Sequence, residues 1–378
     1  MKRILVSLTY YRPHISGLTI YVQRLVEAWV KRGYKVTLLT SRFNSHLARE
    51  ENYHGVKVVR VPVQWRLNKG VLMLTYPWQA AKLLGEHDFV HLHLPSLEAL
   101  ILALLARLKR KKVITTYHCD LQLPRFPGSR FLDQVIRLSH CFTLALSNVI
   151  VAYTEDFAQH SQLLPHFYSK IKVIIPPVIM PLVQKKDLQA WQKKVDWPAG
   201  TVIGMAARFA EDKGIEYLLK AIPLLLKKFP DLKIVFAGEY RQVVGENRYR
   251  ERLQPLLTAY RDHIKFFGIL PQTEMPFFYH SLDCLVVASI NSTESFGLVQ
   301  VEAMLCGTPV VATNLPGVRQ PIQLTGMGEV VKIGDSRSLA AGIIKVLTQR
   351  KKYLRPRTEI EQIFSLSKTL EGYDQLFN

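Results

Sequence analysis

Short apolar runs alternate with helix-like segments in both halves of the chain, and this alternation limits the folds that the sequence can adopt. In the first half, apolar runs at residues 4–8, 35–40, 56–61, 89–93, 112–116 and 148–152 alternate with helical patterns at 18–31, 71–84, 97–109 and 131–146. Strands that are apolar along their whole length are covered on both faces, as in a parallel sheet between helices. The first half is therefore predicted to be a doubly wound α/β domain.

The second half repeats this pattern after a proline-rich segment. Its strand-like runs are 201–206, 233–237, 264–267, 284–288 and 308–312, with helices expected at 215–228 and 336–348. Pro176, Pro177 and Pro181 interrupt regular structure between the halves. We expect one domain over 1–178, a second over 182–358, and a C-terminal helix at 359–378 that packs back on the first domain. Ligands of such sheets bind beyond the carboxyl ends of the strands, and a cleft between the domains is the expected site.

The net charge of +20 is concentrated in the first half of the chain. Residues 1–180 hold 24 Lys and Arg against 10 Asp and Glu. Such a field attracts an anionic partner, which could be nucleic acid, anionic lipid or an anionic glycan, unless the basic face is simply solvated. No nucleic-acid-binding module is recognised, so nucleic acid is not an expected partner.

Cysteine usage and hydropathy indicate the compartment. The four cysteines are scattered and form no C-x-x-C pair, and no apolar run reaches the roughly 20 residues of a membrane span. No spacing of His, Asp and Glu resembles a metal site. The chain is therefore expected to be cytoplasmic and free of metal and disulfides. Its basic half suggests peripheral attachment at the inner face of a membrane.

The segment 293–304 carries the main candidate site. Gly297 stands between a strand-like run and a helical pattern, where it lets a ligand approach the backbone, and the helix N-terminus attracts an anion. Glu294 and Glu302 flank this point. The arrangement suits a ligand with phosphate at its centre and hydroxyl-rich groups at both ends, which describes a nucleotide-sugar. Alternatively, Glu294 complements the helix dipole and Glu302 is a solvated helix residue.

Two features follow predicted strands of the first half. Gly17 lies in the loop after the first strand, where it favours close approach of a phosphate or sugar. His118 follows the strand 112–116 and could donate a hydrogen bond to a sugar hydroxyl. The alternatives are an ordinary turn glycine and a histidine bonded to a backbone carbonyl. His91 and His93 alternate within their strand and are predicted to have structural roles.

Two more features follow strands of the second half. Arg208 and Lys213 flank one strand-to-helix loop, where their charges could converge on a pair of phosphates, unless they form surface salt bridges instead. Gly268 and Ile269 end another strand, where main-chain groups could bind a base.

Together these motifs resemble the retaining glycosyltransferases of family 4, also called glycosyl transferases group 1. Glu294 and Glu302 match the E-x7-E pattern of the family, Arg208 and Lys213 match its R-x4-K pattern, and residues 307–311 match G-x-P-V-V. The resemblance covers nearly the whole chain. It implies a GT-B fold, in which two Rossmann-like domains face a cleft, and a hexosyltransferase-type activity of class EC 2.4. The first domain would bind the acceptor and the second the donor.

The resemblance also implies roles for the donor-binding residues. Arg208 and Lys213 would neutralise the nucleotide diphosphate that leaves. Glu302 would accept hydrogen bonds from the ribose, and Glu294 from the donor sugar. The main chain of Ile269, beside Gly268, would bind the base.

Backbone and histidine contacts complete the implied site. Phe296, Gly297 and Leu298 would offer N–H groups to phosphate and sugar. Gly17 would let the first domain approach the donor, and His118 would contact the donor sugar near the reacting carbon. Residues 315–319 depart from the commoner Gly-Gly-Ile-Pro-Glu, so the sequence leaves the identity of the sugar open.

The implied chemistry needs neither a metal nor a cofactor. A UDP- or GDP-linked sugar would react with retention, the leaving phosphate taking the acceptor proton. The acceptor would be a glycan or a lipid-linked molecule, presented in the latter case at an anionic membrane surface. The alternatives are a nucleotide-sugar epimerase or glycoside phosphorylase on the same fold, or a non-catalytic nucleotide-sugar-binding protein.

Overall fold

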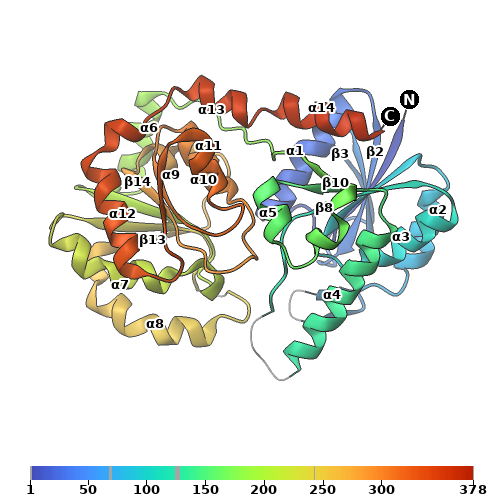
Figure 1. Cartoon of the computed structure of the whole chain (residues 1–378), viewed down its shortest axis with the longest axis horizontal. Coiled ribbons are helices and arrows are strands. Elements are labelled where there is room, and N and C mark those ends of the chain that lie inside the picture. Colours follow the sequence, from blue (N-terminus) through green and yellow to red (C-terminus); the bar gives the residue numbers. More distant parts are fainter. Residues whose placement is uncertain (1, 68–69, 124–127, 242, 378) are drawn as a thin grey trace. The chain divides into compact units, whose positions relative to one another are not determined.

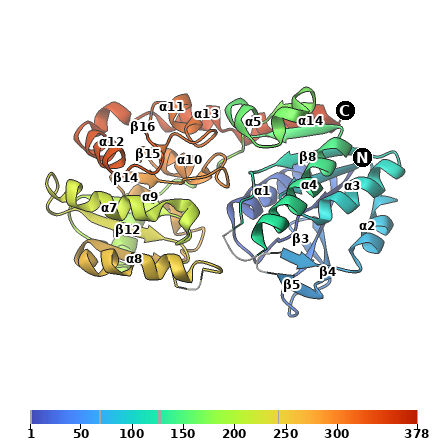
Figure 2. The ribbon, with the colours of Figure 1, turned by 60° about the horizontal axis from the view of Figure 1, so that its bottom comes forward.

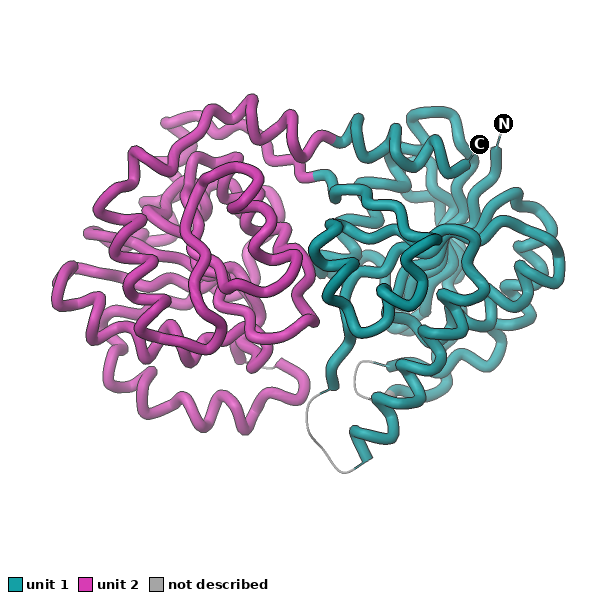
Figure 3. The backbone as a smooth tube through the Cα atoms, viewed as in Figure 1, with its two compact units in different colours: residues 1–177, 366–378 teal, residues 178–365 magenta. Residues whose placement is uncertain are grey.

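The computed structural model describes residues 2–67, 70–123, 128–241 and 243–377. Contacts divide the chain into two compact units (Figure 3). The first unit is Met1–Pro177 with Leu366–Asn378, and the second is Val178–Ser365. Each unit has its own hydrophobic core.

The first unit is built on an eight-stranded sheet in the order β10-β9-β8-β7-β1-β2-β4-β3 (Figure 1). All neighbours pair in parallel except the edge pair β3 and β4. The strands are β1 (Arg3–Ser7), β2 (Lys35–Arg42), β3 (Glu50–Tyr53), β4 (Val56–Pro62), β7 (Phe89–Leu94), β8 (Lys112–Tyr117), β9 (Val149–Ala152) and β10 (Ile171–Val173), and β5 (Trp65–Leu67) and β6 (Gly70–Leu72) form a separate hairpin.

Helices cover both faces of this sheet. On one face, α2 and α3 share a core with the inward residues of the strands. On the other face, Trp29 of α1 packs against Tyr373 and Phe377 of α14. The helices are α1 (Gly17–Lys31), α2 (Tyr76–Leu84), α3 (Glu98–Leu108), α4 (Ser129–Leu146), α5 (Glu155–His160), the 3-10 helix η1 (Leu164–Lys170) and α14 (Leu366–Phe377).

The second unit holds a six-stranded, fully parallel sheet in the order β13-β12-β11-β14-β15-β16. The strands are β11 (Val202–Ala206), β12 (Lys233–Ala237), β13 (Ile264–Gly268), β14 (Cys284–Val287), β15 (Val310–Thr313) and β16 (Gly328–Val331). This is the strand order of a Rossmann domain.

Helices also enclose the second sheet. Helices α7, α8 and α12 contribute to one core (Figure 2), while α9, α10, α11 and α13 pack among themselves. The helices are α6 (Lys185–Lys194), α7 (Ile215–Leu226), α8 (Asn247–Ala259), α9 (Met275–His280), α10 (Leu298–Leu305), α11 (Gln320–Thr325), α12 (Ser336–Thr348) and α13 (Arg357–Ile363), with 3-10 turns η2 (Glu211–Lys213), η3 (Arg261–His263) and η4 (Arg350–Tyr353).

The predicted fold class, two doubly wound parallel sheets, is confirmed. Two predicted helices differ from the structure. The helix expected at 71–84 begins at Tyr76, because residues 70–72 pair with β5 and Pro77 starts the helix. The tail expected as one helix over 359–378 is two helices that break at Phe364, and only the second, α14, groups with the first unit.

Each sheet has one point at which the strand order reverses. In the first unit β1 lies between β2 and β7, and in the second β11 lies between β12 and β14. Ligands of doubly wound sheets bind beyond the carboxyl ends of the strands at such a point. The loops after β1, β7, β11 and β14 are therefore the places to look for a site.

Candidate functional site

An ion pair spans the strand-order reversal of the second unit. Lys213 ends the loop after β11, and its Nζ donates to Glu294 Oε2 at 2.7 Å in the loop after β14. Asp212 Oδ2 lies 3.2 Å from the same Nζ. The structure thus brings together Lys213 and Glu294, which the sequence placed 81 residues apart.

The two loops are also fixed through their backbones. Ile290 N–H donates to the Asp212 carbonyl at 3.0 Å. Gly214 has φ +64°, and a Cβ there would lie 2.0 Å from the Ala288 carbonyl oxygen. Only glycine lets the loops come this close, so the position of Lys213 depends on Gly214.

The surroundings of Lys213 stabilise its charge. Burial on its own would lower the pKa of the ammonium group, but the carboxylates of Glu294 and Asp212 outweigh burial and raise that pKa above its ordinary value. Lys213 is therefore charged at every physiological pH. Its ammonium group is held in place by the carboxylates of Glu294 and Asp212.

Gly297 and Gln300 shape the start of α10. Gly297 has φ +75°, and a Cβ there would lie 2.7 Å from Gln300 Nε2. That buried amide donates to the carbonyls of Phe296 and Val318, each at 2.9 Å. The first N–H groups of a helix have no partner inside it, so Gln300 holds this loop while the helix N-terminus stays available. The sequence reasoning did not single out Gln300, whose only signal was a polar residue in an apolar helix pattern.

The other residues predicted for the site in the second unit are Glu302, Arg208, Gly268 and Ile269. Glu302, on α10, accepts from the hydroxyl of Tyr279 at 2.9 Å. Arg208 is half-buried, and no described carboxylate pairs with it. Gly268 (φ +70°) has open space where a side chain would stand, and the following Ile269 is exposed.

In the first unit, Gly17 is the first residue of α1. Ser16 caps the helix: its Oγ accepts from Thr19 N–H at 3.2 Å. The buried Arg60 holds the preceding loop by donating to the Arg12 carbonyl at 3.1 Å. The Gly17 loop is therefore ordered by packing within its own unit.

His118 lies in a buried polar cluster between the sheet, α1 and α14. Its Nε2 is 2.9 Å from His93 Nδ1, and its Nδ1 bonds to the Tyr153 hydroxyl. His91 Nε2 bonds to Thr116 Oγ1 at 2.8 Å. The structural roles predicted for His91 and His93 are confirmed. The partners of His118 are side chains, where a backbone carbonyl had been the expected alternative.

Burial controls the protonation of this cluster. It lowers the pKa of His118 to about 3, and burial together with the nearby His118 lowers that of His91 to about 3. Both rings are therefore neutral at pH 7. His118 therefore carries no positive charge.

A buried carboxyl group at the strand-order reversal of the first unit was not predicted. Glu98 Oε2 accepts from Ser96 Oγ at 2.7 Å and from Thr9 Oγ1 at 3.2 Å. Burial raises the pKa of Glu98, and these hydrogen bonds oppose the rise. Glu98 ties the loop after β7 to the loop after β1. Its only signal in the sequence was a single acid at the start of an apolar helix.

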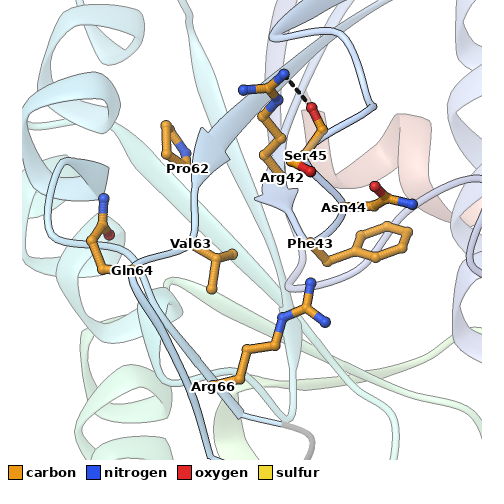
Figure 4. A pocket seen from close by; sticks show the side chains of 8 residues that line it. All are labelled: Arg42, Phe43, Asn44, Ser45, Pro62, Val63, Gln64 and Arg66. Atoms are coloured by element: carbon orange, nitrogen blue, oxygen red, sulfur yellow. Dashed lines mark hydrogen bonds between the residues drawn. The ribbon is translucent and has the colours of Figure 1, made fainter.

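A hollow of about 640 Å³ lies at the carboxyl ends of β2 and β4 (Figure 4). Arg42 comes from β2 and Arg66 from β5. Arg42 donates to the carbonyls of Ser45 and Leu47, both at 2.6 Å, and so orders one wall. Phe43, another lining residue, packs edge-on against Tyr10 in the loop after β1. The lining residues are Arg42, Phe43, Asn44, Ser45, Pro62, Val63, Gln64 and Arg66.

Two absences apply to the described part of the chain. It holds no group of three or more His, Cys, Asp and Glu side chains able to bind a metal ion. It also holds no helix with the length and apolar content needed to cross a bilayer.

In comparisons with known proteins, both halves of the chain match glycosyltransferase families. Residues 188–362 match the family described as "Glycosyl transferases group 1", and residues 16–176 match "Glycosyl transferase 4-like domain". The chain is 27% identical to the 2-deoxystreptamine N-acetyl-D-glucosaminyltransferase of Streptomyces fradiae (87% of this chain, 82% of the relative). It is 28% identical to the phosphatidyl-myo-inositol mannosyltransferase of Mycobacterium leprae (72% and 67%). Anabaena HepE in complex with UDP-glucose has the same fold, with a TM-score of 0.78 at 18% identity over 100% of this chain and 99% of that one.

The buried histidines predict that acid destabilises the protein. Unfolded histidine takes up a proton near pH 6.5, whereas folded His91 stays neutral down to about pH 3. The stability that neutral His91 contributes is therefore fully present above pH 6.5, and it is lost as the pH drops from there towards 3. His91→Gln, which can still bond to Thr116, should lose about 2 kcal/mol less of its free energy of unfolding between pH 7 and pH 5 than the wild type. Urea unfolding at both pH values measures this. An equal loss in the variant, or the same gain from His46→Gln at an exposed site, contradicts the prediction.

Proposed function

The chain is a glycosyltransferase of the GT-B fold, and we propose that it transfers a sugar with retention from a UDP- or GDP-linked donor to a hydroxyl group of a glycan or lipid-linked acceptor. The observation that carries the proposal is the charge of Lys213, held at the strand-order reversal of the second unit by Glu294 and Asp212. The UDP-glucose in the HepE complex supports a donor of this class.

The leaving diphosphate would meet three positive features of the second unit. Lys213 would exchange a carboxylate for a phosphate oxygen, and the guanidinium of Arg208 would add a second charge. The N-terminus of α10, after Gly297, would supply backbone N–H groups from Phe296 to Leu298. These groups would stabilise negative charge as it develops on the diphosphate.

The carboxylates would orient the sugar and the ribose. Glu294 lies 2.7 Å from Lys213, so a sugar that bonds to Glu294 would have its anomeric phosphate beside that ammonium group. Glu302 is oriented by Tyr279 and would accept from ribose hydroxyls. The exposed main chain at Gly268 and Ile269 would bind the base.

The first unit would supply the acceptor side of the reaction. Gly17 would let its loop approach the donor, and His118 would contact the donor sugar. Both ring nitrogens of His118 already have buried partners, so this contact requires the ring to give up His93 or Tyr153. Retention follows if the acceptor attacks on the face that the phosphate leaves, with a phosphate oxygen taking the acceptor proton.

The hollow between Arg42 and Arg66 is the proposed acceptor pocket. It lies at the carboxyl ends of β2 and β4, next to the loop after β1. Arg66 is exposed, and no described carboxylate pairs with it. An acceptor with a phosphate or carboxylate group fits this charge. The relative that acts on phosphatidyl-myo-inositol supports a lipid-linked acceptor at an anionic membrane surface.

A panel of nucleotide-sugars tests the donor site through release of the nucleoside diphosphate. Lys213→Ala should lower turnover about a hundredfold, because one charge contact to a leaving diphosphate is worth on the order of 3 kcal/mol. Lys227→Ala, at an exposed position of the same unit, is the matched control, and thermal unfolding checks that both variants fold. A Lys213→Ala enzyme within twofold of wild type would refute the phosphate assignment. If the nucleotide-sugar is converted without an acceptor, the protein is an epimerase. If the reaction needs inorganic phosphate, it is a phosphorylase.

The positive charges of the second unit should also make the reaction independent of divalent cations. We expect turnover to survive excess EDTA, since Arg208, Lys213 and the α10 N-terminus would balance the leaving diphosphate. The assay is repeated with EDTA and then with added Mg²⁺ or Mn²⁺. Complete loss that only the metal reverses would point to a metal site absent from this proposal.

Arg66 should control the affinity for an anionic acceptor. Arg66→Gln is expected to raise the KM of a phosphate-bearing acceptor about tenfold, because a hydrogen bond to a charged group contributes roughly 1.5 kcal/mol. The same acceptor without its phosphate should be unaffected. Lys31→Gln, an exposed change elsewhere in the first unit, is the control. Equal effects on both acceptors, or none on either, would remove Arg66 from the acceptor site.

A further inference from the structure

Helix α4 turns its most apolar side to solvent. Phe131, Val135, Leu138 and Phe142 are 72%, 41%, 57% and 54% exposed. At 3.6 residues per turn, their spacing places all four within an arc of about 60° on the helix surface. We name them the α4 stripe.

The opposite side of α4, which faces the protein, is less apolar than the stripe. Its buried residues are Ser129, Ser139, His140, Thr143 and Leu144. An amphipathic helix normally buries its apolar side against the core. In α4 that rule is reversed, so folding does not explain the two phenylalanines.

The neighbouring helix α3 also exposes apolar side chains. Helices α3 and α4 pack side by side (Figures 1 and 2). Leu104 and Leu108 of α3 are exposed as well. Exposed apolar side chains gathered on a helix face mark an interaction site in a soluble domain.

The charges around the stripe are positive. Arg130 and Arg137 are exposed along one flank of α4, and Arg107, Lys109 and Arg110 are exposed at the end of α3. The carboxylates of residues 89–154 are Glu98, Asp120 and Asp133, and none of them is exposed. An ordinary solvated surface carries both signs of charge. Helices α3 and α4 therefore expose basic side chains and no acidic one, which favours an anionic partner.

We propose that the α4 stripe lies in the interface of an anionic lipid bilayer, with the phenylalanines among the acyl chains and the flanking arginines at the headgroups. An apolar stripe beside a basic flank is the pattern of helices that lie in the plane of a membrane. The basic flank draws the surface to acidic lipid, and burial of the stripe retains it there. The bilayer would bring the first unit close to a lipid-linked acceptor, and this purpose rests on the proposed function. Lipid binding itself is measured without any sugar.

Two interactions with different salt dependence follow from this arrangement. Attraction between exposed charges is screened as salt rises, whereas burial of apolar surface is not weakened by screening. Full-length protein should sediment with vesicles of phosphatidylcholine mixed with phosphatidylglycerol at low salt. At high salt, part of this binding should remain.

Two double variants separate the apolar part of vesicle binding from the electrostatic part. Phe131→Ser with Phe142→Ser should lower the vesicle partition coefficient about tenfold or more and abolish the salt-resistant part. Arg130→Gln with Arg137→Gln should lower the preference for phosphatidylglycerol and leave the salt-resistant part. The matched controls lie in the second unit: Leu182→Ser at an exposed leucine, and Lys227→Gln with Lys228→Gln at exposed lysines. Both controls should sediment like wild type.

Several outcomes would overturn the proposal. The phenylalanine variant could sediment like wild type, or Leu182→Ser could lose as much binding. Light scattering could instead show a wild-type dimer that the phenylalanine variant loses, which would make the stripe a contact between copies. All variants should fold and should release nucleoside diphosphate from a nucleotide-sugar as wild type does. If no nucleotide-sugar is turned over, the proposed function fails and the vesicle result still stands.

Discussion

Parallel pairing of buried strands is the constraint on which the rest of this structure depends. In a parallel sheet each crossover returns the chain to the end of the sheet where strands begin. Every strand therefore has its outgoing loop at the other end, the carboxyl end. Where the strand order reverses, two such loops leave in opposite directions and flank one point. In the second unit these loops carry Lys213 and Glu294, and in the first they carry Thr9 and Glu98. The chemistry of the chain is gathered at these points by topology, although the residues are far apart in sequence.

The alternation of apolar runs was enough to predict the two sheets, because a strand buried on both faces has few polar positions. It was not enough for elements with little buried surface. Helix α8 buries only Tyr249 and Leu253 and was not predicted. In α4 the helix itself was predicted, but periodicity cannot tell which of two faces meets the core. The more apolar one is the exposed one.

The candidate site was predictable in its residue types but not in its contacts. The sequence suggested phosphate or a salt bridge for Lys213 and sugar for Glu294, whereas the structure bonds Lys213 to Glu294 and to Asp212. A ligand at Lys213 would therefore have to compete with carboxylates that already neutralise it. Gln300 and Glu98 were missed because their roles come from burial, which a single polar letter in an apolar pattern does not indicate. The assignments to donor and acceptor stay predictions.

The last helix has a consequence for how the protein is made. Tyr373 and Phe377 are fully buried against α1 in the first unit, although they are almost the last residues of the sequence. A ribosome delivers the chain from its N-terminus, and domains commonly fold as they emerge. The second unit, which is continuous in sequence, can complete its core during synthesis. The first unit can complete its core around Trp29 only after α14, which follows the whole of the second unit in sequence, has been translated.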